Sequence, residues 1–180
     1  MILKIYRPFL AIAILISLFF LAFSQSSCRT YRFKDVSIPD SVKFVKINQF
    51  QNRATYVNPS LAPELTERLG QKIRSQTRLG ITTNADDRSQ QIWIIECTIT
   101  TYSISTAGIS NQQVNANRLN VGVKVVVRDN RTQKEIGKYD VTTPFEYSGS
   151  LSLQQAEQGL QSQILRDVTD AIFNRIFSNW

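Results

Sequence analysis

The stretch from Arg118 to Arg128 alternates between apolar and polar side chains, and this pattern constrains the fold more than any other feature. Its odd positions, from Leu119 to Val127, carry only leucine and valine, whereas the even positions include Arg118, Lys124 and Arg128. Successive side chains of a β-strand point to opposite faces, so one face of this strand is buried and the other is polar. The pattern predicts a sheet that is covered on one side only.

Other segments supply the remaining strands and two covering helices. β-branched and aromatic residues predict strands over three segments, namely Val42–Phe50, Gln91–Ser105 and Glu135–Phe145. A shorter strand is predicted at 80–83. The polar stretch Thr106–Asn117 is predicted to be a turn region. Apolar residues recur every three or four positions in the segment Ser60–Arg78 and again from Ser152 to the C-terminus, which predicts two helices.

Capping residues fix the expected ends of these helices. Asn58 or Ser60 can cap the first helix, and Gly80 stands where a left-handed C-terminal cap is expected. Ser152 and Gln155 have the spacing of a capping box at the start of the second helix. The order of elements predicts an α+β fold, in which two helices pack on one face of a mixed, mostly antiparallel four-stranded sheet.

The first 27 residues have the pattern of an export signal. Lys4 and Arg7 precede an uncharged apolar run, which ends in small polar residues before Cys28. Such a run is short for a membrane span. Three interpretations compete: a cleaved signal that releases a soluble protein, an uncleaved anchor, and a lipoprotein signal that is cut before Cys28. Ser26 and Ser27 favour the lipoprotein, with a lipid on the Cys28 thiol, although Gln25 replaces the usual aliphatic residue.

The expected organisation is therefore a signal peptide over residues 1–27, a lipidated tether over 28–40 and a single domain over 41–180. Without Lys4 and Arg7 the net charge falls from +7 to +5. A basic protein outside the cytoplasm is expected to meet phosphate-bearing lipids or glycolipids, and not nucleic acid. The same charge can also serve solubility alone.

The composition argues against an enzyme. The chain has no histidine, which removes the commonest general base near neutral pH and most metal sites. Cys97 lies among apolar strand residues and is expected to be a buried, inert thiol. Asp86 and Asp87 adjoin in a loop but lack the ligand spacing of a calcium site. We therefore expect no catalytic residue, no metal and no cofactor, apart from the covalent lipid on Cys28.

The uncovered face of the sheet is the candidate binding surface. It is expected to carry hydroxyl, amide and basic side chains: Thr98, Thr100, Arg118, Asn120, Lys124 and Arg128. Three interpretations remain open for this face, which can meet water, the wall of a polar cavity or an acidic glycolipid.

Several segments, in this order and spacing, resemble a divergent branch of the LptE family of lipopolysaccharide-assembly lipoproteins. They are Tyr31–Phe33, Ser37–Pro39, Phe50–Ala54, Val57–Leu61, Ser75–Leu79, Arg118–Val121 and Ile172–Trp180. Arg29 stands where glycine is usual, and together with Gln25 it departs from the family pattern around the processing site.

The resemblance implies a lipoprotein on the periplasmic face of the outer membrane, held by a lipid in its inner leaflet. Its partners would be an LptD-type β-barrel, which it plugs and helps to assemble, and lipopolysaccharide. The candidate phosphate contacts are then Arg118, Lys124 and Arg128, because cationic side chains form charge-assisted bonds to phosphate. The alternative is a generic envelope lipoprotein binding module without a barrel partner. An envelope hydrolase is disfavoured.

Overall fold

A computed structural model of the chain describes residues 38–110 and 113–178. All the described residues belong to one compact unit. The predicted tether and signal peptide, with Cys28, lie outside the described residues.

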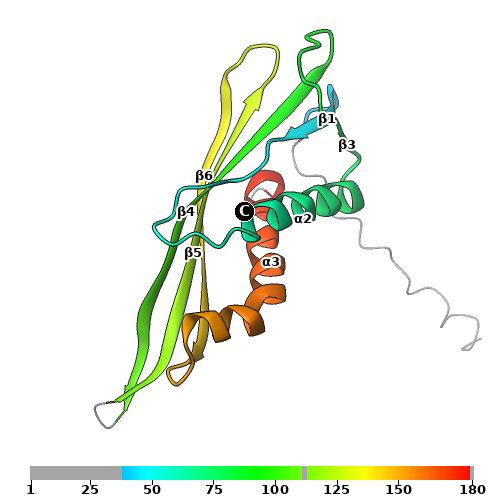
Figure 1. Ribbon diagram of the computed structural model, residues 1–180. Coiled ribbons are helices and arrows are strands. Elements are labelled where there is room, and N and C mark those ends of the chain that lie inside the picture. The colour runs from blue at the N-terminus through cyan, green and yellow to red at the C-terminus, as the bar shows by residue number, and fades with distance from the viewer. Residues whose placement is uncertain (1–37, 111–112, 179–180) are drawn as a thin grey trace, which may run out of the picture. The chain divides into compact units, whose positions relative to one another are not determined.

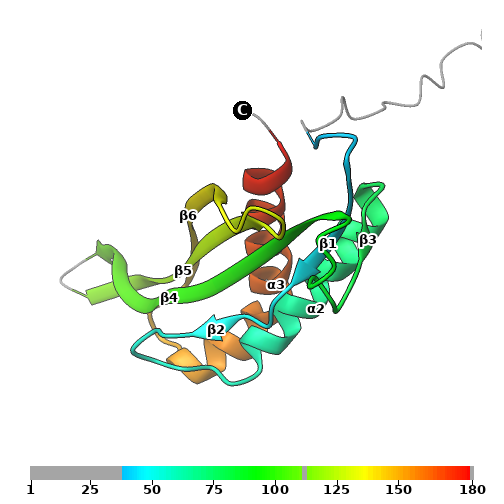
Figure 2. The same cartoon turned by 90° about the horizontal axis from the view of Figure 1, so that it is seen from above.

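The compact unit is an α+β fold, as predicted, with two helices and a mixed sheet (Figure 1). The strands are β1 (Val42–Ile47), β2 (Gln51–Asn52), β3 (Gly80–Ile81), β4 (Gln91–Ser110), β5 (Gln113–Asp129) and β6 (Glu135–Ser148). The helices are α2 (Leu61–Gln76) and α3 (Leu153–Phe177). Figure 2 shows that both helices lie on the same side of the sheet.

The sheet has six strands instead of the predicted four, in the order β3-β1-β4-β5-β6, with β2 pairing to β4 off this path. The two strands beyond these four have two residues each: β3 lies within the short strand predicted at 80–83, whereas β2 is too short to leave a periodic pattern in the sequence. β1, β2 and β3 run parallel to their partners, whereas β4, β5 and β6 form an antiparallel meander. The long antiparallel strands therefore make up most of the sheet.

The β4–β5 hairpin is longer than predicted. The segment 106–117 does not form an extended turn region, because β4 continues to Ser110 and β5 begins at Gln113. Thr106 pairs with Asn117, and the ladder continues past this pair with register shifts on both sides of Gly108. Figure 1 shows this hairpin continuing past the N-terminal turn of α3.

The two helices form from the predicted apolar stripes and differ in their ends. Leu65, Leu69 and Ile73 of α2 are fully buried. In α3 the capping box is present, since the Ser152 hydroxyl accepts from the Gln155 amide and the Gln155 side chain accepts from the Ser152 amide. The left-handed cap predicted at Gly80 is wrong: α2 ends at Gln76 with Thr77 as its C-cap, and Gly80 lies in β3 with no positive φ.

The core lies between the helices and one face of the sheet. Odd-numbered residues of β5, from Leu119 to Val127, are at most 2% exposed. The two helices also contact each other, because the Lys72 ammonium on α2 forms an ion pair of 2.8 Å with Asp170 on α3 and lies 5.3 Å from the centre of the Phe173 ring. The last turns of α3, with Ile172 and Phe177, are among its most deeply buried parts.

Candidate functional site

The uncovered face of the sheet carries the three predicted phosphate contacts on a single strand. Arg118, Lys124 and Arg128 all belong to β5, on the face opposite the buried valines. At about 3.3 Å per strand residue, Arg118 and Arg128 lie about 33 Å apart along the strand. The structure therefore places these cations in one row, but too far apart to bind a single phosphate together.

Two of the three cations already have carboxylate partners on neighbouring strands. The Arg118 Nη2 donates to Glu146 Oε1 at 2.7 Å, and the Arg128 Nε donates to Glu96 Oε2 at 3.1 Å. The side-chain amide of Asn48, the residue after β1, also donates to Glu96 at 3.4 Å. These side chains are about half exposed, and ion pairs of this kind contribute about 0–1 kcal/mol each.

Lys124 is the cation of this row that is most available to a ligand. In the register of the sheet it lies between Thr98 on β4 and Asp140 on β6. Among the described carboxylates none lies within ion-pair distance of its ammonium. It therefore offers an unpaired charge to a phosphate or to a carboxylate of a partner.

The face as a whole is close to neutral. Basic and acidic side chains alternate over its neighbouring strands, namely Lys46, Glu96, Arg118, Lys124, Arg128, Glu135, Lys138, Asp140 and Glu146. Each cation of β5 stands opposite an acidic residue of β6 in the register. Such a surface is polar without a strong field of one sign, so it suits contact with a polar wall as well as with water.

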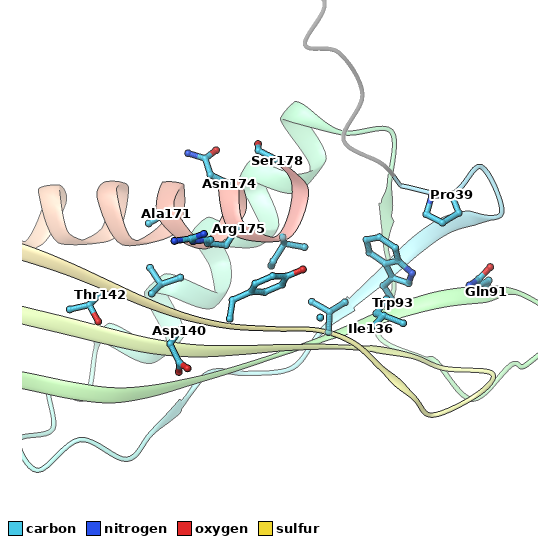
Figure 3. A pocket seen from close by; sticks show the side chains of 15 residues that line it. Pro39, Gln91, Trp93, Ile136, Asp140, Thr142, Ala171, Asn174, Arg175 and Ser178 are labelled. Carbon is cyan, nitrogen blue, oxygen red and sulfur yellow. The ribbon is translucent and has the colours of Figure 1, made fainter. Parts of the chain in front are cut away.

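A cleft of about 760 Å³ lies on the other face, between the C-terminal turns of α3 and strand β6 (Figure 3). Its apolar lining comes mainly from the sheet, with Trp93, Ile136, Tyr139, Val141 and Ile176. The volume falls within the range of roughly 300–1,000 Å³ that is usual for ligand sites.

The polar groups of the cleft belong mostly to α3. Figure 3 shows Arg175 between the helix and the strands, whereas Asp140 and Thr142 point to the opposite side of β6. The cleft thus offers one cation and the amide of Asn174 beside an apolar floor.

A cluster of two tyrosines and a glutamate connects the segment before α2 with α3 and β4. The Tyr102 hydroxyl donates to Glu157 at 2.6 Å, and Tyr56 stacks on Tyr102 with ring centres 5.5 Å apart. Burial, followed by the hydrogen bond to the Glu157 carboxylate, raises the pKa of Tyr102 above its ordinary value. Tyr102 therefore stays a neutral donor, and the cluster positions Tyr56 at the surface, where its side chain is 43% exposed.

The remaining residues singled out in the sequence do not form a reactive site. Cys97 is 2% exposed, and burial, followed by the Glu96 charge, raises the pKa of its thiol, so it is the inert thiol that was predicted. Asp86 and Asp87 are exposed in the loop before β4. Within residues 38–110 and 113–178, no three metal-ligating side chains converge. No helix in these same ranges combines the length and hydrophobicity that crossing a membrane requires.

The cleft was missed at the sequence level. Arg175 interrupts an apolar run between Phe173 and Ile176, but a cation in the last helical turn is commonly explained by the helix dipole. Trp93 alternates with Ile95 along β4 as a core residue does, and it is only 9% exposed. Only the position of α3 over β6 reveals that these two residues line one cavity.

Comparison with known proteins agrees with this architecture. A minor lipoprotein from Acinetobacter baumannii has a TM-score of 0.51 at 14% identity, over 74% of this chain and 91% of its own. A Xanthomonas campestris protein has a TM-score of 0.53 at 9% identity, over 75% of this chain and 85% of its own. At these identities the likeness establishes the fold alone. No curated protein matches the sequence.

A family model, described as LptE, lipopolysaccharide-assembly, matches residues 42–176. The match covers well over half of the chain and includes every strand and both helices, apart from the last residue of α3. It thus agrees with the resemblance carried by the segments around Phe50, Arg118 and Ile172. The chain belongs to the LptE family of lipopolysaccharide-assembly proteins.

Proposed function

We propose that this protein is an outer-membrane lipoprotein, anchored by a lipid on Cys28, that plugs and helps to assemble an LptD-type β-barrel for lipopolysaccharide transport to the cell surface. The observation that carries the proposal is the family match over residues 42–176. The role is one of binding and assembly, without catalysis or a bound cofactor.

The surface of the sheet supports a role as a plug. The lumen of an outer-membrane barrel is polar, so a plug needs its own apolar core and a polar exterior. The helices and the sheet enclose such a core, and the uncovered face presents paired charges such as Arg118 with Glu146 and Arg128 with Glu96. A nearly neutral face of this kind can meet a polar wall with little electrostatic repulsion.

The first test is isolation of the tagged full-length protein from detergent-solubilised outer membranes. We expect it to retain a large β-barrel protein in a one-to-one ratio, identified by mass spectrometry and by its heat-modifiable mobility on a gel. A Cys28→Ala variant is the matched control, and it should leave the membrane fraction if Cys28 carries the anchor. Recovery of a lone monomer would contradict the plug role and leave a generic lipoprotein binding module.

We further propose that Arg118, Lys124 and Arg128 contact the phosphates of lipopolysaccharide one at a time along β5. The triple substitution of these residues to alanine should weaken lipopolysaccharide binding by about tenfold, because each charge-assisted bond contributes only modestly at an exposed site. The measurement is titration of the purified full-length protein with fluorescently labelled lipopolysaccharide.

The matched control removes the same charge from the helices, through alanine at Arg68, Arg74 and Arg166. These side chains are exposed, and the variant separates the effect of net charge from the effect of the β5 row. Equal losses in both triple variants, or no loss in the β5 variant, would remove these three residues as a lipopolysaccharide site. Loss of the barrel with unchanged lipopolysaccharide affinity would instead make the row a barrel contact.

A further inference from the structure

Two unpaired edges of the sheet, namely β6 and the side of β4 beyond its pairing with β2, differ in how they are protected from pairing with other chains. β6 forms one edge, and its outward positions carry charges and a proline, namely Lys138, Asp140, Pro144 and Glu146. Charged side chains and proline are the usual means by which an edge strand is kept from pairing. The β6 edge is therefore closed to a further strand.

The second edge is the outer side of β4 beyond Ile99, and it lacks such protection. β2 pairs with β4 only at Thr98 and Ile99, and the last backbone bond along it runs from Arg53 N to Ile99 O, at 2.9 Å. No other described strand pairs with this side of β4. The sequence from Thr98 to Asn117 contains no charged residue and no proline. This edge is open to another strand.

The backbone of this edge presents free groups at defined residues. Before the bulge at Thr100, the β4 residues whose side chains face the helices direct their backbone carbonyls away from β5. The carbonyls of Ile95 and Ile99 accept from the Asn48 and Arg53 amides on that side. Past the bulge, Tyr102 and Ile104 are the residues on the helix side, since they pair with Val121 and Leu119. Alternation then directs the amides and carbonyls of Tyr102 and Ile104 to the open edge.

The segment around Ser103 is self-complementary for antiparallel pairing. In a pair of these segments centred on Ser103, Tyr102 stands opposite Ile104 of the second copy, and Thr101 stands opposite Ser105. Aromatic residues opposite β-branched residues, and hydroxyls opposite hydroxyls, are favourable cross-strand pairs. Two-fold symmetry requires this self-complementarity, because each residue must match its counterpart on the second copy.

Exposed apolar side chains lie beside the same edge. Ile104 is 47% exposed, Val57 is 52% exposed, and Tyr56 stacks on the buried Tyr102. In the pairing centred on Ser103, Ile104 of each copy would come next to Tyr102 and Tyr56 of the other. The pairing thus covers apolar surface that one copy alone leaves in water, and this favours a second copy over a strand of unrelated sequence.

We propose that two copies of this chain associate through antiparallel pairing of their Thr101–Ser105 segments, with the two-fold axis at Ser103. The contact joins two sheets edge to edge and is small, so the dimer is reversible and depends on concentration. The inference does not rest on the transport function proposed above. A second copy of the chain pairs with the open edge of β4 whenever no other protein covers that edge.

Cysteine cross-linking tests the register. Ser103 directs its backbone to β5, so the two Ser103 residues form a non-hydrogen-bonded pair with Cα atoms about 4.5 Å apart, within disulfide reach. The full-length Ser103→Cys variant, purified in excess detergent and mildly oxidised, should give a disulfide-linked dimer. Ser105→Cys is the matched control on the same face and edge, because the two Ser105 residues would lie about 13 Å apart in this register.

Equal cross-linking of the two variants, or cross-linking of neither, would overturn the proposal. A disulfide from Ser103→Cys to a different envelope protein in whole cells, without self-linking, would assign the edge to that protein and also overturn it. The parent chain, which retains Cys28 and Cys97, provides the background in every experiment.

A charge substitution tests the association without cysteine chemistry. Ser103→Lys would place two ammonium groups against each other at the axis, so light scattering should show a monomer at concentrations where the parent chain dimerises. Thr142→Lys on the guarded β6 edge should dimerise like the parent. Because both positions are exposed, thermal melts should be unchanged and would show that each variant is folded. A parent chain that stays monomeric, or a dimer that survives Ser103→Lys, would contradict the proposal.

Discussion

Asn130→Asp is expected to destabilise the protein by about 3–5 kcal/mol, because the change replaces a buried N–H donor group with a carboxylate oxygen that faces backbone carbonyls. Asn130 is 1% exposed, and its Oδ1 accepts from the Ile92 amide at 2.7 Å. Its Nδ2 faces the carbonyls of Ala85, Asp87 and Gln90 at 3.0–3.3 Å. A carboxylate would set negative charge against these carbonyls. The measurement is the free energy of unfolding from urea titration followed by circular dichroism.

Asn84→Asp is the matched control for this substitution. Asn84 is exposed in the same loop, and its Oδ1 accepts from the Asp86 amide at 2.8 Å, a bond that a carboxylate can also make. Its free energy of unfolding should change by no more than about 0.5 kcal/mol. If the two variants unfolded alike, Asn130 would not be the group that fastens the loop before β4 to the turn after β5.

The features predicted correctly from the sequence are those fixed by neighbours within one element. The alternation from Leu119 to Val127 needs only the two-residue repeat of a strand, and its apolar positions are the buried ones. The capping box needs only the spacing of Ser152 and Gln155, and both of its hydrogen bonds are present. The class of fold follows from the order of these elements, so it too could be predicted.

The features that were missed depend on contacts between distant segments. Gly80 was interpreted as a helix cap, but a Cβ at this position would lie 2.7 Å from the Phe44 ring of β1, so a close approach between strands accounts for the glycine. The partners of Arg118 and Arg128 depend on the strand register, which composition does not reveal. The cleft beside Arg175 exists only because α3 crosses above β6.

Phe177→Ala is expected to cost about 3–5 kcal/mol, because it empties a fully buried site at the end of α3. Phe177 is 0% exposed and packs against Phe173 with ring centres 4.9 Å apart. The residues next to it, Ile176 and Ser178, line the cleft. We therefore expect loss of global stability together with early amide exchange in the last turns of α3, measured by hydrogen–deuterium exchange mass spectrometry.

The control for this variant is Ile136→Ala, which alters the floor of the same cleft at a side chain that is 48% exposed. Because little apolar surface is buried there, this change should cost no more than about 1 kcal/mol and leave exchange in α3 unaltered. If Phe177→Ala also cost less than about 1 kcal/mol, the end of α3 would lie outside the cooperative core. The walls of the cleft would then open independently of the sheet. If the cost is large, α3 is held rigidly over β6, and the cleft is a preformed cavity maintained by the same core that folds the protein.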